Sequence, residues 1–379
     1  MRSTAAAMTF AFLAEGCAGA APTFGPPVRI PLPPGFHPVA VAAADFNGDG
    51  IADIVVVGGR NDLLLLTGDG RGGFRAGPPV PAGSNPSSMA VADMNGDGHL
   101  DVLVANHESD YVTLLLGDGA GHFAPRTLHL HSNPHPHAVA IGDFDRDGHP
   151  DIAVDSWGEN RIMLLFGRDE WRGPGTPVEL GTNPYYTIAA ADLDGDGNLD
   201  LVAPNWGHGT VSILFGDGHG HFAHAAGSPF AAGPSPFSAV IVDVNGDHHP
   251  DIVVANYSGH ANMTANDGLT WIRNDGDRRF TPFPERVARG DYSARVAAGD
   301  VNGDGFLDCA FSNSNGATVT VVYGSSRGLR GTDSVATMLS PHALALADLD
   351  GDGRADLIVT SEKSDEILVF FTRRPAAQH

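Results

Sequence analysis

A nine-residue pattern, D-x-[ND]-x-D-x-x-x-D, occurs seven times in this chain of 379 residues. Its first aspartates lie at positions 45, 93, 143, 192, 243, 300 and 348. A spacing of about 50 residues, kept over seven copies, indicates that each copy belongs to one supersecondary unit of a repeat architecture. The chain is therefore predicted to form a repetitive array and not a set of unrelated domains.

The residues around each copy of the pattern read as short β-strands. In the second copy, Ser88–Ala92 leads into the loop and Val102–Ala105 leaves it, and the runs Tyr111–Leu116 and Arg126–Leu130 follow. Short apolar runs closed by glycine, asparagine or aspartate are typical of strands and not of helices, so very little helix is expected. Four antiparallel strands in each of seven units predict an all-β protein, a seven-bladed β-propeller with four-stranded blades.

The two ends of the chain are expected to meet in the last blade. The seventh unit ends after its third strand, Ile367–Phe371, and has no fourth strand of its own. Near the N-terminus, Phe24–Leu32 follows the pattern of a fourth strand. This segment is predicted to complete blade seven and close the ring, which would remove exposed sheet edges. One propeller would then occupy residues 21–379.

The charge of the chain excludes one class of partner. Its 22 Lys and Arg residues face 45 Asp and Glu residues, which gives a formal net charge of −23. Nucleic acid binding needs basic patches that this composition does not supply. More than half of the acidic residues lie in the seven loops, and seven divalent ions would reduce the net charge to about −9. Stability that depends on a bound cation is therefore expected.

The first 20 residues are predicted to be a secretory signal peptide. Arg2 precedes the apolar run Ala5–Ala14, and small residues at 18–20 suit a cleavage site. A lipoprotein anchor at Cys17 is the less favoured alternative, because Glu15 does not suit that signal. No later segment has the apolar length of about 18 residues that a membrane span needs. We expect a secreted protein, extracellular or periplasmic, that is a monomer.

The seven loops carry the ligands that a calcium ion prefers, which are carboxylate, amide and main-chain oxygens. Side chains at loop positions one, three, five and nine, with the carbonyl at position seven, would coordinate up to seven Ca2+ ions. The predicted ligands are Asp45, Asn47, Asp49, Ile51 and Asp53; Asp93, Asn95, Asp97, His99 and Asp101; Asp143, Asp145, Asp147, His149 and Asp151; Asp192, Asp194, Asp196, Asn198 and Asp200; Asp243, Asn245, Asp247, His249 and Asp251; Asp300, Asn302, Asp304, Phe306 and Asp308; and Asp348, Asp350, Asp352, Arg354 and Asp356.

The pattern differs from the calcium loop of an EF-hand. The twelfth position, where an EF-hand has its final acid, is apolar, and strands rather than helices flank each loop. The sixth position is glycine in six loops, as in Gly50, and allows a left-handed turn. His248 takes this position in loop five, so strain is expected there. Asx-type turns that hold no ion are the alternative explanation of the pattern.

The loops and the turns L-x-G-D-G-x-G-x-F resemble the FG-GAP/VCBS repeats of integrin alpha subunits and of many bacterial surface proteins. The resemblance runs from Thr23 to Phe371. It implies a propeller with structural calcium in the loops that join strands one and two of each blade. It also implies adhesion or ligand recognition on the opposite face. Members of one repeat family serve different functions, so the resemblance does not identify a ligand.

Alternating strand direction places a second set of loops on the face away from calcium. Aromatic and histidine side chains there suit the recognition of a protein or glycan ligand. The candidate ligand-binding residues are Trp157, Trp206, Tyr257, Tyr186, Phe237 and His137. Alternatively, the residues just before each first strand only fill the central channel.

Catalysis is not expected, because the chain lacks the common motifs for hydrolytic or phosphate chemistry. The alternative is a polysaccharide lyase or hydrolase that uses Arg295, Tyr186 and His137 in the channel. A purely structural scaffold is a second alternative. Histidines such as His129 and His137 are interpreted as solvated loop residues, and Cys309 as a buried packing residue.

Overall fold

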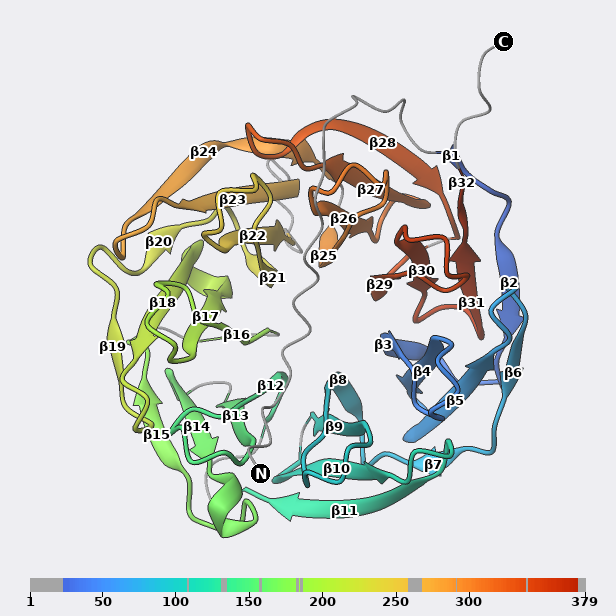
Figure 1. The fold of residues 1–379 in the computed structure, drawn as a ribbon, viewed down its shortest axis with the longest axis horizontal. Coiled ribbons are helices and arrows are strands. Elements are labelled where there is room, and N and C mark those ends of the chain that lie inside the picture. Colours follow the sequence, from blue (N-terminus) through green and yellow to red (C-terminus); the bar gives the residue numbers. More distant parts are fainter. Residues whose placement is uncertain are drawn as a thin grey trace.

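The chain folds into a ring of seven antiparallel sheets around a central channel (Figure 1). The structure, a computed structural model, describes residues 23–107, 109–130, 135–156, 159–181, 184, 187–257, 268–290, 292–338 and 340–373. The predicted all-β, seven-bladed propeller is confirmed. Two short 3-10 turns, η1 (Gly167–Asp169) and η2 (Trp206–His208), are the helical elements of the described residues.

Each blade contains four strands, with the first nearest the channel, and in blades one to six they follow sequence order. Blade one has β3 (Pro38–Ala44), β4 (Asp53–Gly58), β5 (Asp62–Gly68) and β6 (Phe74–Ala76), and β7 (Val80–Pro81) also pairs with β5. Blade two has β8 (Pro86–Ala92), β9 (Asp101–Asn106), β10 (Tyr111–Gly117) and β11 (Phe123–His129). Blade three has β12 (Val139–Gly142), β13 (Asp151–Ser156), β14 (Arg161–Leu165) and β15 (Thr176–Glu179).

The next three blades repeat this order. Blade four has β16 (Ala189–Ala191), β17 (Asp200–Asn205), β18 (Thr210–Gly216) and β19 (Phe222–His224), and β20 (Phe230–Ala231) also pairs with β18. Blade five has β21 (Pro236–Val242), β22 (Asp251–Asn256), β23 (Gly268–Asn274) and β24 (Phe280–Arg289). Blade six has β25 (Ser293–Gly299), β26 (Asp308–Asn313), β27 (Thr318–Tyr323) and β28 (Arg330–Ala336).

Blade seven joins the two ends of the chain, as the sequence predicts. Its strands are β29 (Leu344–Ala347), β30 (Asp356–Thr360), β31 (Glu366–Phe370) and β2 (Val28–Pro31). The N-terminal β2 pairs antiparallel with β31, with Ile30 opposite Ile367. Outside this pairing, β1 (Thr23–Phe24) pairs with β32 (Thr372–Arg373) and extends the closure. Residues 1–22 lie outside the described part of the chain, so the signal peptide remains a prediction.

The core lies between neighbouring blades. The second strands, such as β4 and β9, are buried along their whole length. Val55 and Val57 of β4 pack against Val102 and Val104 of β9 in one of seven apolar clusters around the ring. A blade covered on both faces has no polar side, which explains why these strands read as continuous apolar runs and not as alternating ones.

Candidate metal centres and the opposite face

Each acidic loop connects the first and second strands of a blade and orients its own carboxylates. In loop one, Asp45 accepts hydrogen bonds from the backbone N–H groups of Gly48 (2.7 Å) and Gly50 (2.8 Å). Asp49 accepts one from the N–H of Ile51, at 2.8 Å. In all seven loops the N–H of residue six donates to the first aspartate, at 2.8 or 2.9 Å. The same loop conformation is therefore built seven times.

The ninth residue of the loop ties it to the third strand. Asp53 is fully buried, and its two oxygens accept N–H groups from Phe46 (3.1 Å) and from Gly68 at the end of β5 (2.9 Å). The equivalent aspartate does the same in every blade except blade five. There Asp251 accepts the N–H of Asn274, and no donor of normal geometry in the described residues reaches its second oxygen.

Burial of this ninth aspartate has an electrostatic cost. Burial raises the pKa of Asp151 to about 6 and the pKa of Asp200, Asp308 and Asp356 to about 7. Backbone N–H groups lower these pKa values in part, whereas the other loop aspartates raise them further. A carboxylate in this position needs either a proton or a nearby cation, so the loop favours a divalent ion.

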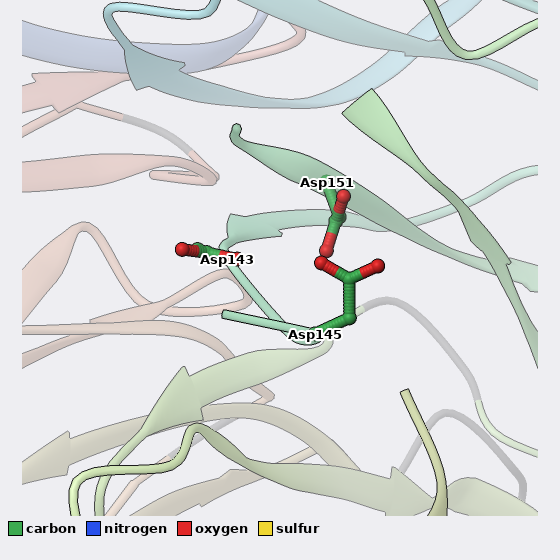
Figure 2. Close-up of side chains that lie close together, drawn as sticks. All are labelled: Asp143, Asp145 and Asp151. Atoms are coloured by element: carbon green, nitrogen blue, oxygen red, sulfur yellow. The ribbon is translucent and has the colours of Figure 1, made fainter. Parts of the chain in front are cut away.

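Three loops bring aspartate oxygens closest together. They are the loops with aspartate at position three, where the oxygens of the first, third and ninth residues lie within 4.8 Å of one another. Figure 2 shows one of them, in which the carboxylates of Asp145 and Asp151 face each other beside Asp143. The other two sets are Asp192, Asp194 and Asp200, and Asp348, Asp350 and Asp356. The donors are all oxygens, which fits calcium and not a soft transition metal.

Two loops adopt the common conformation without the usual glycine. His248 has φ of 66° at position six, and its N–H still donates to Asp243 at 2.8 Å. Arg146 has φ of 58° at position four, and its guanidinium donates to Asn198 of the next blade's loop, at 3.2 Å. The left-handed conformation expected at His248 is present. Loop five thus keeps its shape at a cost of about 1 kcal/mol in backbone strain.

Arginines already contact two of the three loops that have aspartate at position three. The guanidinium of Arg168 forms an ion pair with Asp145. Arg278, from the turn after β23, forms ion pairs with Asp194 and, at 3.1 Å, with Asp196. Among the described residues, no ion pair reaches Asp350 in loop seven. A cation entering loops three and four would therefore compete with a resident guanidinium.

The opposite face brings some of the candidate ligand residues together. The rings of Phe237 and Tyr257 lie 5.0 Å apart, and Tyr257 meets Tyr292 edge-on at 5.1 Å. Phe237 itself is buried, so it supports the cluster and does not form an open platform. Trp206 lies in η2 of blade four. Trp157 and Tyr186 fall outside the described residues.

The histidines near the channel differ from the sequence interpretation. His129 is exposed, as expected, but His137 is buried and its ring lies 4.1 Å from that of His107. The interpretation of His137 as a solvated loop residue is therefore wrong, because the residue lies between two blades. Burial lowers the pKa of both His137 and His342 to about 3, with nearby positive charge adding to the effect. Cys309 is fully buried, as predicted.

Arg295 was a candidate only under the enzyme alternative, and Asp155 was not among the candidates. Arg295 lines the channel, and Asp155 is buried at the end of β13. Arg295 also stands out when the seven first strands are compared, since the other blades have a small residue at its position. Asp155 lies near the end of the apolar strand β13 and accepts N–H groups from His137 and Ala138, contacts that no local sequence pattern indicates.

These features define a seven-bladed propeller with one acidic loop in every blade. The chain belongs to the FG-GAP-like repeat family, whose model matches residues 53–104, 93–154, 192–254, 260–311 and 300–359. No curated protein matches the chain in sequence. Among the described residues, no helix has the length and apolar composition needed to cross a membrane.

Two solved structures share the fold at low sequence identity. BBS1N, crystallised in complex with ARL6DN and soaked with lead, is 13% identical with a TM-score of 0.60. That comparison covers 90% of this chain and 93% of BBS1N. An Agrocybe aegerita lectin that recognises non-reducing terminal N-acetylglucosamine is 18% identical with a TM-score of 0.52. It covers 78% of this chain and 79% of the lectin. At these identities the likeness shows the fold alone.

Proposed function

We propose that this protein is a secreted, calcium-stabilised recognition module that binds a protein or carbohydrate on the face opposite the acidic loops. The observation that carries the calcium assignment is the loop conformation, which is held by the same backbone hydrogen bond in all seven blades. Calcium would be held by the side chains at positions one, three, five and nine, and its charge would neutralise the buried carboxylates.

Recognition is favoured over catalysis by the chemistry of the channel. His137 and His342, with pKa values of about 3, are neutral at physiological pH and are weak bases. The two structural relatives support a binding role, since one was crystallised with a protein and the other recognises a sugar. A polysaccharide lyase or hydrolase remains the competing proposal and predicts turnover of an anionic polymer.

Calcium dependence can be tested on the full chain by thermal unfolding with calcium and with a chelator. Calcium at a hundred times its dissociation constant should stabilise the fold by about 2.7 kcal/mol for each site. Asp348→Asn should remove one bound ion in calorimetric titration, whereas Asp110→Asn, the same charge change at an exposed position, should remove none. Equal melting temperatures in calcium and chelator would exclude the calcium role.

Ligand recognition needs a separate experiment. Glycan and protein arrays probed in calcium should give binding that is lost in chelator, because the loops hold neighbouring blades in place. The same preparation should show no depolymerisation of uronate-containing polysaccharides. Polymer cleavage without array binding would support the enzyme alternative and exclude the recognition function.

A further inference from the structure

The central channel has one position that differs from its equivalents around the ring. A cavity of about 200 Å³ lies there, lined by residues from all seven blades. The first strands of the blades surround this centre in Figure 1. The residue five places before each acidic loop lines it in every blade. Six of these residues are small, and the seventh is arginine: Ala40, Ser88, Ala138, Thr187, Ser238, Ala343 and Arg295.

Arg295 places its charge at the end of the channel away from the acidic loops. It lies near the start of β25, and each first strand runs from that face toward its loop. Its Nη2 donates to the backbone carbonyl of Ser87 in blade two, at 3.1 Å, so the side chain reaches across the ring. The guanidinium also lies over the ring of Phe237, 5.7 Å from its centroid.

Filling space does not account for this residue. Arg295 is only partly buried, whereas a side chain that only filled the channel would be apolar. The other described residues that line the cavity are uncharged. Arg295 therefore supplies a single cationic group inside a channel of small side chains, in a protein whose net charge is −23.

The channel suits a small anionic group. Arginine donates two parallel N–H groups to a carboxylate in a geometry that matches it. Ser88 also lines the cavity, and within the described part of the chain its buried hydroxyl has no hydrogen-bond partner. This hydroxyl could donate to the same ligand. A volume of about 200 Å³ is below the range of roughly 300–1,000 Å³ for small-molecule sites, which favours one inserted side chain.

We propose that this channel mouth binds the carboxylate of an aspartate or glutamate side chain presented by a partner protein, with Arg295 as its anchor. The inference rests on the proposed recognition function and gives it a ligand class. Phe237 lies under the anchor and supports Tyr257 and Tyr292, which are partly exposed and would contact the apolar part of the inserted segment. Glu362 lies 3.1 Å from His342 in the same region, and its negative charge would repel the carboxylate of the ligand.

The test follows the arginine Nε–Hε signals by NMR while N-acetyl-Gly-Glu-Gly-amide is added. One signal, absent from the spectrum of Arg295→Gln, should shift with the Glu peptide and not with the matching Gln peptide. Glu362→Gln should lower the peptide concentration needed for half of the shift by about threefold, because it removes a competing charge. Arg330→Gln, the same change at an exposed residue of β28, should leave the response unaltered.

Four results would overturn the proposal. The Arg295 signal could stay unchanged with the Glu peptide, or respond equally to the Gln peptide. Alternatively, glucuronate could shift it at a tenfold lower concentration, which would assign the site to an acidic sugar. Array binding that persists in Arg295→Gln would reject the channel site while leaving the recognition function intact. The melting temperature of each variant shows whether a lost NMR response or lost array binding is due to unfolding.

Discussion

Asp155 is a buried carboxylate that satisfies two backbone groups and leaves one of its own oxygens unpaired. Its Oδ1 accepts the N–H groups of His137 (2.7 Å) and Ala138 (2.6 Å). Its Oδ2 is buried with no partner among the described residues. Burial raises its pKa from 3.8 to about 7, and the two N–H groups only partly oppose this. At neutral pH the burial of this carboxylate therefore destabilises the native state.

Replacing Asp155 should change how stability depends on pH. The native state holds the Asp155 proton more tightly than the unfolded state, so wild-type stability falls as the pH rises from about 4 to about 7. Asp155→Asn lacks this titrating group. The free energy of unfolding of the variant, relative to wild type, should therefore rise by up to about 1.4 kcal/mol per pH unit in that window. Urea unfolding in saturating calcium at pH 5, 6, 7 and 8 measures the difference. Parallel curves for the two proteins would contradict the prediction.

At the scale of structural elements, each loop depends on the next blade as well as on its own strands. The ring of Phe46 in loop one packs edge-on against Phe123 of blade two, at 5.9 Å. Phe144 of loop three meets Phe222 of blade four at the same distance. The phenylalanine that ends the glycine-rich turn thus covers the loop of the preceding blade. This contact gives a physical reason for the joint recurrence of the two motifs in the sequence.

The arginine contacts predict that the metal sites are not equivalent. Arg278→Gln should tighten calcium binding at loop four by about three- to tenfold, because Asp194 and Asp196 lose a competing cation. Calorimetric titration should then show one additional site in the tight class. Arg330→Gln is the matched control and should leave the number of tight sites unchanged. A fall in that number would mean that the guanidinium supports the loop instead of competing for it.

At the scale of the whole molecule, stability depends on closure of the ring by β2. Ile30 is buried in the cluster between blades seven and one, whereas Arg29 points outward and pairs with Glu366 at 2.7 Å. The two side chains lie on opposite faces of one strand, as the period of two requires. Because β2 supplies the fourth strand of blade seven, losing its apolar contact would expose the edge of β31.

The closing strand gives a prediction with an internal control. Ile30→Ala should lower the free energy of unfolding by about 2–5 kcal/mol, since it leaves a cavity in a packed cluster. Arg29→Ala removes an exposed ion pair and should cost less than about 1 kcal/mol. Chemical unfolding of both variants in calcium measures the two changes. Similar losses for the two variants would show that the strand contributes through its backbone alone.

The regular spacing of the acidic loops determined the architecture of the protein. Seven repeats of a unit of up to four apolar runs allow little besides a propeller. The fourth run is missing from the last unit, which predicts closure by Phe24–Leu32. The clustering of the loop carboxylates was predictable because the side chains lie within nine residues of one another. The strain at His248 was also local, since a left-handed turn depends on that residue alone.

The channel was decided only by the tertiary structure. Arg295 and Ser87 are more than two hundred residues apart in sequence and meet across the ring. The burial of His137 and the ion pairs of Arg278 likewise depend on which blades are neighbours. A repeat pattern specifies the unit and its period, because these follow from local hydrogen bonding and apolar spacing. It does not specify the contacts of a residue that differs from its equivalents in the other blades and lies where the seven units meet. Such a side chain gains its partners only when the ring closes.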